Sequence, residues 1–112
     1  MTVSVTTDRA TVPMPTRPLG RTGWNASVLT LGGVKWDTFI PEAEAVRLIQ
    51  RAIELGVNCI DTAASYGEGR SETRLGLALL GLLDRVFVST KTCKRDYDGA
   101  RREVNQSLER LR

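Results

Sequence analysis

Residues 56–67 read Gly-Val-Asn-Cys-Ile-Asp-Thr-Ala-Ala-Ser-Tyr-Gly, and the architecture of the chain can be inferred outward from them. After the glycine comes an apolar run at residues 57–60, which Asp61 and a turn of small residues bring to an end. A short apolar run between turn signals is typical of a buried strand. Asp61 therefore falls at the carboxyl end of a predicted strand, and Tyr66 falls in the loop that follows it.

Helical patterns lie on both sides of this strand. Pro41 is predicted to open a helix, with Glu42 and Glu44 in its first turn, and Gly56 is predicted to stop it. Ser71 is predicted to cap a second helix, and a third is expected to begin near Asp98. Apolar residues recur at helical spacing in the three segments: Ala45, Val46, Ile49, Ala52 and Ile53; Leu75, Ala78, Leu79 and Leu82; Ala100, Val104, Leu108 and Leu111.

Two further apolar runs, at residues 28–31 and 86–90, predict strands that alternate with these helices. Ahead of them, two short extended pieces around Gly20 and Gly23 predict a hairpin. Residues 1–15, rich in Thr and without periodicity, predict a flexible leader. The order is a hairpin followed by three strand–helix units, which implies a parallel α/β sheet whose apolar strands are buried on both faces.

Two architectures fit this order: a doubly wound sheet, or part of a (β/α)8 barrel. The first strand leads into Gly32-Gly33-Val34, which is neither the GxGxxG fingerprint nor a Walker loop. The later Gly67-Glu68-Gly69 has Glu72 where GxGxxG requires glycine. A dinucleotide-binding doubly wound domain is therefore disfavoured, and the barrel interpretation is preferred.

Composition excludes several classes of function. The chain of 112 residues contains no His, two Cys and a net charge of +3. His-based catalysis, His-containing zinc sites and a four-thiolate zinc site are therefore excluded. Aromatic residues make up only 5% of the chain, so no stacking platform for nucleic acid accompanies its basic residues. With no secretory signal and no membrane-spanning run, we expect a cytoplasmic protein whose Cys59 and Cys93 are free thiols.

Three polar residues fall at the carboxyl ends of the predicted strands: Asp61, Tyr66 and Lys91. Functional groups of parallel sheets gather at this edge. A phenol ordinarily has a pKa of about 10, and an adjacent ammonium favours the phenolate, so the trio suits proton transfer to or from an oxygen. Singly, each residue also fits a structural role, since an Asp before a turn is often a cap and a terminal Lys is often solvated.

The same residues lie in blocks that resemble the aldo-keto reductases over residues 16–112. Residues 17–23, Arg-Pro-Leu-Gly-Arg-Thr-Gly, with residues 27–33, Ser-Val-Leu-Thr-Leu-Gly-Gly, resemble that family's opening hairpin and first strand. Residues 56–67, followed by Gly69-Arg-Ser-Glu72 and Leu75-Gly76, resemble its signature. Residues 87–91, Phe-Val-Ser-Thr-Lys, resemble its third strand.

The resemblance implies the N-terminal part of a (β/α)8 barrel, here a hairpin and three βα units. It implies reduction of an aldehyde or ketone, or the reverse oxidation of an alcohol, by direct hydride transfer from NADPH, with NAD as the alternative cofactor. Because the hydride passes directly to the carbonyl carbon, the resemblance implies no metal. Tyr66 would be the general acid, activated by Lys91 and Asp61. The resemblance also places Gly32, Gly33, Val34 and Asp61 near the cofactor, and Trp36 beside the substrate pocket.

The chain also departs from the family. The family's fourth catalytic residue is a His that ends the fourth strand, and its main cofactor loops come later still; neither is present. A complete barrel takes about 250 residues. We therefore expect that the 112-residue polypeptide alone neither folds stably nor turns over substrate. The alternative function is a noncatalytic interaction or regulatory module: a partial barrel that another chain completes, or a barrel-derived regulator of the kind known as potassium-channel β subunits.

Overall fold

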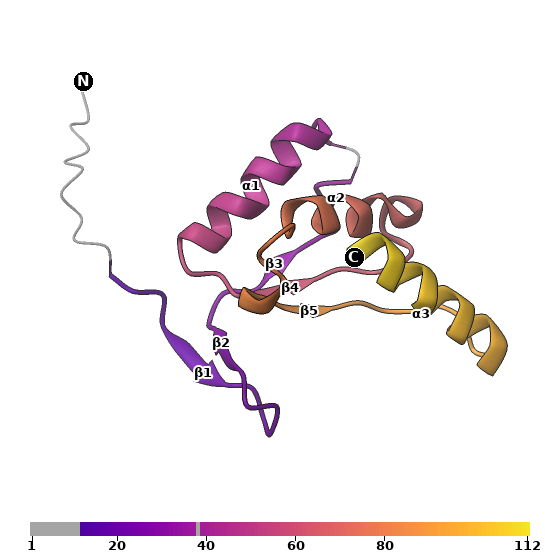
Figure 1. Ribbon diagram of the computed structural model, residues 1–112, viewed down its shortest axis with the longest axis horizontal. Coiled ribbons are helices and arrows are strands. Elements are labelled where there is room, and N and C mark those ends of the chain that lie inside the picture. Colours follow the sequence, from indigo (N-terminus) through magenta and orange to yellow (C-terminus); the bar gives the residue numbers. More distant parts are fainter. Residues whose placement is uncertain (1–11, 38) are drawn as a thin grey trace.

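A small parallel sheet lies beside a layer of helices in the computed structural model, which describes residues 12–37 and 39–112 (Figure 1). The strands are β1 (Thr16–Pro18), β2 (Asn25–Ser27), β3 (Leu31–Gly32), β4 (Cys59–Asp61) and β5 (Phe87–Ser89). The helices are α1 (Glu42–Glu54), α2 (Arg70–Ala78) and α3 (Tyr97–Leu111), with short 3-10 helices η1 (Tyr66–Gly69) and η2 (Leu83–Arg85). Most of the predicted leader lies outside the described residues, and residues 12–15 have no regular secondary structure.

The sheet has the order β3-β4-β5, and both pairings are parallel. The register places Gly32 beside Asp61 and Asp61 beside Ser89. Strands β1 and β2 form a separate antiparallel hairpin, as predicted. Asn58 joins the hairpin to the sheet: its side-chain oxygen accepts from the Ser27 N–H at 2.7 Å, and its own N–H donates to the Ser27 hydroxyl at 3.0 Å.

The first strand of the parallel sheet is not where the apolar run predicts it. Residues 28–31 are predicted as the strand, whereas β3 begins only at Leu31 and includes Gly32. Val28 and Leu29 are exposed. The Val28 N–H donates to the Pro15 carbonyl at 2.9 Å, so this part of the run extends the hairpin and is not available to the sheet.

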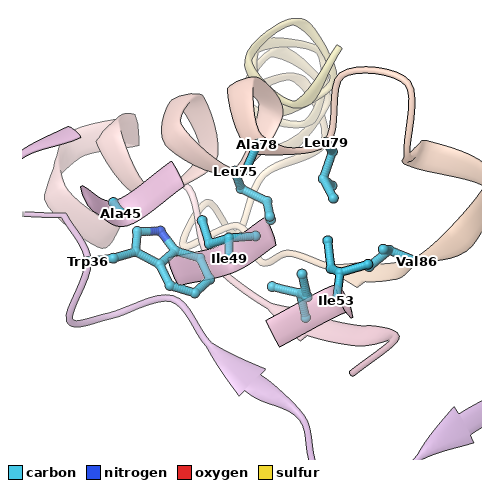
Figure 2. Close-up of a cluster of buried hydrophobic side chains, with 9 residues drawn as sticks. Trp36, Ala45, Ile49, Ile53, Leu75, Ala78, Leu79 and Val86 are labelled. Carbon is cyan, nitrogen blue, oxygen red and sulfur yellow. The ribbon is translucent and has the colours of Figure 1, made fainter. Parts of the chain in front are cut away.

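The core lies between the sheet and the faces of α1 and α2 (Figure 2). Ala45, Ile49 and Ile53 of α1 face Leu75 and Ala78 of α2, as the helical spacing predicts. Trp36, Ile60, Leu79 and Val86 complete the buried cluster. Helix α1 begins at Glu42, one residue after Pro41, and its acidic first turn suits the positive end of the helix dipole.

Helix α3 packs closely on α2 at Gly76. A Cβ atom on Gly76 would lie 2.1 Å from the Arg110 carbonyl oxygen, so only glycine allows this approach. The buried residues of α3 are Gly99 and Ser107. The predicted apolar stripe of α3 is only partly a core face: Leu111 packs against the core cluster, whereas Val104 and Leu108 are 45% and 63% exposed. Helix α3 therefore contacts α2 closely at its C-terminal end and leaves Val104 and Leu108 exposed.

The expectation that all three strands are buried on both faces holds only for part of the sheet. Cys59 and Ile60 of β4 are buried, while Leu31, Phe87 and Val88 are half-buried. The physical reason is the strand order, because in the described residues β3 and β5 each pair with a neighbour on one side only. No helix in this part of the chain is long and apolar enough to cross a membrane.

We predict that the 112-residue polypeptide alone lacks a cooperative unfolding transition. In the described residues, β3 and β5 each have one unpaired edge, and the apolar side chains of Val104 and Leu108 face solvent. Apolar surface that stays exposed adds nothing to the free energy of unfolding. Thermal unfolding should be followed by circular dichroism and by the fluorescence of Trp24 and Trp36. Coincident sigmoidal transitions from both probes would contradict the expectation.

Candidate active site

Asp61 and Lys91 meet at the carboxyl ends of β4 and β5. Lys91 follows β5 by two residues, and its Nζ donates to Asp61 Oδ2 at 2.7 Å. The hydroxyl of Ser89, the register partner of Asp61, donates to Oδ1 at 2.6 Å. Both carboxylate oxygens of Asp61 are therefore engaged, and its orientation is held from two sides.

Tyr66 lies at the start of η1, beside the ammonium of Lys91. Its hydroxyl oxygen is 3.5 Å from Lys91 Nζ, and the Nζ lies 4.9 Å from the centre of the phenol ring. A separation of 3.5 Å is long for a hydrogen bond. The firm partners of the ammonium are Asp61 and the carbonyl of Thr62, which accepts at 2.6 Å. The phenol lies at the edge of this group and remains free to bond a ligand.

The turn after Tyr66 depends on unusual backbone angles. Gly67, Glu68 and Gly69 have φ values of 59°, 55° and 93°, all in the left-handed region. Two of the three are glycines, which adopt this region without steric cost. A Cβ on Gly67 would also come within 2.7 Å of the Asp37 side chain. The tight reversal leads the chain from Tyr66 directly into α2.

The charges of the pair reinforce each other. Partial burial raises the pKa of Asp61, but the hydrogen bonds from Lys91 and Ser89 outweigh it and hold that pKa below its ordinary value. The hydrogen bond to Asp61 raises the pKa of Lys91 above its ordinary value. The pair is therefore ionised from below the usual pKa of an aspartate to above that of a lysine.

The remaining predicted site residues lie on the loop that leaves β3. Gly32 is next to Asp61 in the register, and the Gly33 N–H donates to the Asp61 carbonyl at 2.8 Å. A Cβ on Gly32 would meet open space, and Val34 is exposed, so a planar group can approach this backbone beside Asp61. The four residues predicted to lie near a cofactor thus share one edge with Tyr66 and Lys91.

Trp36 is placed differently from the other predicted residues. It is buried in the core, and its indole N–H donates to the Ser71 carbonyl at 3.3 Å. It also lines a cavity of ≈ 380 Å³ on the α1 side of the sheet. The residues lining this cavity are Leu31, Gly32, Lys35, Trp36, Phe39, Ile40 and Leu48. Asp61, Tyr66 and Lys91 do not line it, so the structure separates Trp36 from the polar group.

Four partners of the site were not anticipated from the sequence. The Ser89 hydroxyl donates to Asp61, and the Thr62 carbonyl accepts from Lys91. The side chains of Ser71 and Glu72 hydrogen-bond to Gly33 and Thr90, which follow the ends of β3 and β5. Aligning the strand ends would have placed Ser89 beside Asp61. Ser71 is predicted as a helix cap, which is wrong: α2 follows Gly69, and the Ser71 hydroxyl instead donates to the Gly33 carbonyl. In the described residues, no three acidic or thiol groups gather as a metal site.

The comparisons with known proteins agree with this geometry. Residues 28–112 match the model of the Aldo/keto reductase family. The chain belongs to this family. The similar solved structures are aldo-keto reductase (β/α)8 barrels, of which the chain spans about 40%.

Three relatives illustrate the similarity of this aldo-keto reductase chain. PA4992 from Pseudomonas aeruginosa, assigned to the same family, is 42% identical with a TM-score of 0.75, over 86% of this chain and 41% of PA4992. An aldo-keto reductase from Klebsiella pneumoniae, solved with NADPH, is 28% identical with a TM-score of 0.72, over 78% of this chain and 32% of that one. A Schizosaccharomyces pombe protein assigned as a voltage-gated potassium channel β subunit is 34% identical, over 96% of this chain and 36% of its own length.

A chimera provides the setting in which this site can be tested. In it, residues 16–112 replace the matching part of PA4992, which supplies the rest of a barrel. We refer to this protein as the chimera.

We predict that Asp61→Asn lowers the pKa of Lys91 in the chimera, because the hydrogen bond and charge that raise it are lost. The titration of the lysine side chain can be followed by NMR. Between the lowered pKa of Asp61 and the raised pKa of Lys91 the pair is intact. It is lost as pH falls through the first value or rises through the second.

Ser89→Ala is the matched control for this titration. It removes the other hydrogen bond of Asp61 and should raise the pKa of that carboxyl while leaving the Lys91–Asp61 contact in place. A lysine titration that is identical in Asp61→Asn and in the unsubstituted chimera would show that Asp61 does not govern the charge of Lys91.

Proposed function

We propose that this chain forms the proton-transfer part of an NAD(P)H-dependent oxidoreductase. The reaction is the reduction of an aldehyde or ketone to an alcohol, or its reverse. The observation that carries the proposal is the meeting of Asp61, Tyr66 and Lys91, from three separate segments, around one ammonium group. Family membership supports an oxidoreductase, and the neighbour solved with NADPH supports a nicotinamide cofactor.

The roles of the three residues follow from their contacts. When bound, the nicotinamide supplies a hydride to the carbonyl carbon. The Tyr66 hydroxyl gives its proton to the carbonyl oxygen, so that the product carries one hydride and one proton. The Lys91 ammonium stabilises the negative charge left on the phenolate oxygen, and Asp61 keeps the ammonium charged and in place. In the reverse direction the phenolate takes the proton of the alcohol.

The edge beside Asp61 is the proposed place of the cofactor. Gly32 lies beside Asp61 in the register with open space over it, Gly33 is buried and bonded to the Asp61 carbonyl, and Val34 is exposed. NADPH is the proposed cofactor and NAD the alternative. Trp36 is still proposed to border the substrate pocket, since it lies on the loop that continues from Val34. The site as described is open, with the side chains of Asp61 and Lys91 38% and 48% exposed.

Two accompanying proposals concern the polypeptide as a whole. We propose that the 112-residue chain by itself is inactive, because this open site would give solvent free access to the reacting atoms. We also propose a cytoplasmic location. Cys59 and Cys93 are both free thiols, which is the state that a reducing compartment maintains.

A regulatory role is the second candidate function. It rests on the similarity to the Schizosaccharomyces pombe channel-subunit protein, which extends over 96% of this chain. In that case the site would bind the cofactor and would not reduce a carbonyl substrate. A chimera that folds and binds NADPH but does not oxidise it with any of a panel of aldehydes would favour this second function.

We predict that Tyr66→Phe in the chimera lowers kcat for aldehyde reduction by about 10²–10⁴-fold, the range supplied by a general acid. The binding of NADPH, measured by fluorescence titration, should stay within about twofold because the ring remains in place. The oxidation of NADPH, followed by its absorbance, measures kcat.

Tyr97→Phe is the matched control, since Tyr97 is the other tyrosine of this chain and lies exposed at the start of α3. It should leave kcat unchanged. Equal rates in Tyr66→Phe and Tyr97→Phe would remove Tyr66 from the proposed role.

A further inference from the structure

The first turn of α2 carries two polar residues that are completely buried. Ser71 and Glu72 both have 0% of their surface exposed. Burying a hydroxyl or a carboxylate is unfavourable unless each is hydrogen-bonded. Apart from one arginine, their side-chain partners all lie just after the three parallel strands.

Ser71 reaches the ends of β3 and β4 at once. Its hydroxyl donates to the Gly33 carbonyl at 2.8 Å, and its oxygen lies 2.8 Å from the hydroxyl oxygen of Thr62. A serine hydroxyl has a single proton, so Thr62 is the donor in the second contact. The carbonyl of Thr62 in turn accepts from Lys91 Nζ at 2.6 Å. One residue therefore separates Ser71 from the ammonium of the site.

Glu72 reaches the end of β5. Its Oε1 accepts from the Thr90 hydroxyl at 2.6 Å, and Thr90 immediately precedes Lys91. Its Oε2 accepts from the Arg110 guanidinium of α3 at 3.0 Å. The Arg110 guanidinium packs closely against Gly69: a Cβ atom on Gly69 would come within 2.5 Å of the guanidinium carbon. The buried carboxylate is thus compensated by one charge and one hydroxyl.

We propose that Ser71 and Glu72 are positioning residues, which together fix the ends of the three strands and so hold Lys91 against Asp61. Stability alone does not explain a carboxylate here, because well-packed apolar residues are often as stabilising as a buried ion pair. The placement of Lys91 does explain the carboxylate. Thr62, whose carbonyl accepts from Lys91, and Thr90, which precedes Lys91, are both hydrogen-bonded to this one helical turn. The consequence for catalysis rests on the proposed function, whereas the consequence for the position of Lys91 does not.

The test uses two substitutions in the chimera. Ser71→Ala removes both bonds of the serine, and Thr90→Val removes the bond to Glu72 at an exposed position where unfolding is not expected. Thr73→Val is the matched control: Thr73 lies on the same helix, but its hydroxyl donates to the Gly69 carbonyl and touches no strand end.

The primary measurement is the rate at which Lys91 is acetylated by acetic anhydride, read by mass spectrometry relative to the exposed Lys94. Ser71→Ala and Thr90→Val should each raise this relative rate at least about threefold, which corresponds to a fall of half a unit in the pKa of Lys91. Thr73→Val should leave it unchanged. This measurement needs no turnover, so it remains informative if the reductase proposal fails.

The second measurement is steady-state kinetics. Misplacement of a catalytic group by about 1 Å can lower the reaction rate by up to about 10²-fold. We therefore expect kcat to fall by about 10- to 100-fold in both variants, while KM for NADPH and for the aldehyde changes little. A purely structural role would lower the melting temperature without changing the acetylation of Lys91 in the folded protein. Unchanged Lys91 acetylation in folded Ser71→Ala and Thr90→Val would overturn the proposal.

Discussion

The parallel register that sets Gly32, Asp61 and Ser89 side by side is the constraint on which the site depends. It brings the Ser89 hydroxyl to one oxygen of Asp61 and lets Lys91, two residues further on, reach the other. Because side chains alternate along a strand, a shift of the β4 register by one residue would turn Asp61 to the opposite face and break all of these contacts. The helices α1 and α2 secure this register from one side through the core around Ile49, Ile60 and Leu75.

The ion pair at this edge is better explained by chemistry than by stability. Pairs as exposed as Asp61 and Lys91 contribute little to folding, because solvent screens their charges. Their arrangement nevertheless keeps a charged ammonium beside a phenol across a wide range of pH. In the proposed function, that charge stabilises the phenolate that proton transfer from Tyr66 leaves behind. The chain belongs to the aldo/keto reductases, which supports the proposed proton-transfer role of these residues.

Much of the fold could be predicted from local pattern, and the failures have physical causes. The helix positions of α1 follow from apolar spacing alone, as does the strand that ends at Asp61. Spacing gave only part of the face of α3, because Gly76 lets the backbone at Arg110 approach α2 while Val104 and Leu108 stay exposed. Asp61, Tyr66 and Lys91 could be grouped from strand ends. The contacts of Ser71 and Glu72 could not, because a serine and a glutamate in a first helical turn ordinarily indicate capping.

The fate of the hydride tests the central claim most directly, namely that these residues form part of a hydride-transfer site. The chimera should be supplied with an aldehyde and with NADPH in which both hydrogens on C4 of the nicotinamide are deuterium, and the alcohol should be analysed by mass spectrometry. If the hydride passes directly, the alcohol should carry one deuterium on the carbon that carried the carbonyl oxygen. A folded chimera that binds NADPH and yields no alcohol, or yields alcohol without deuterium at that carbon, would contradict it.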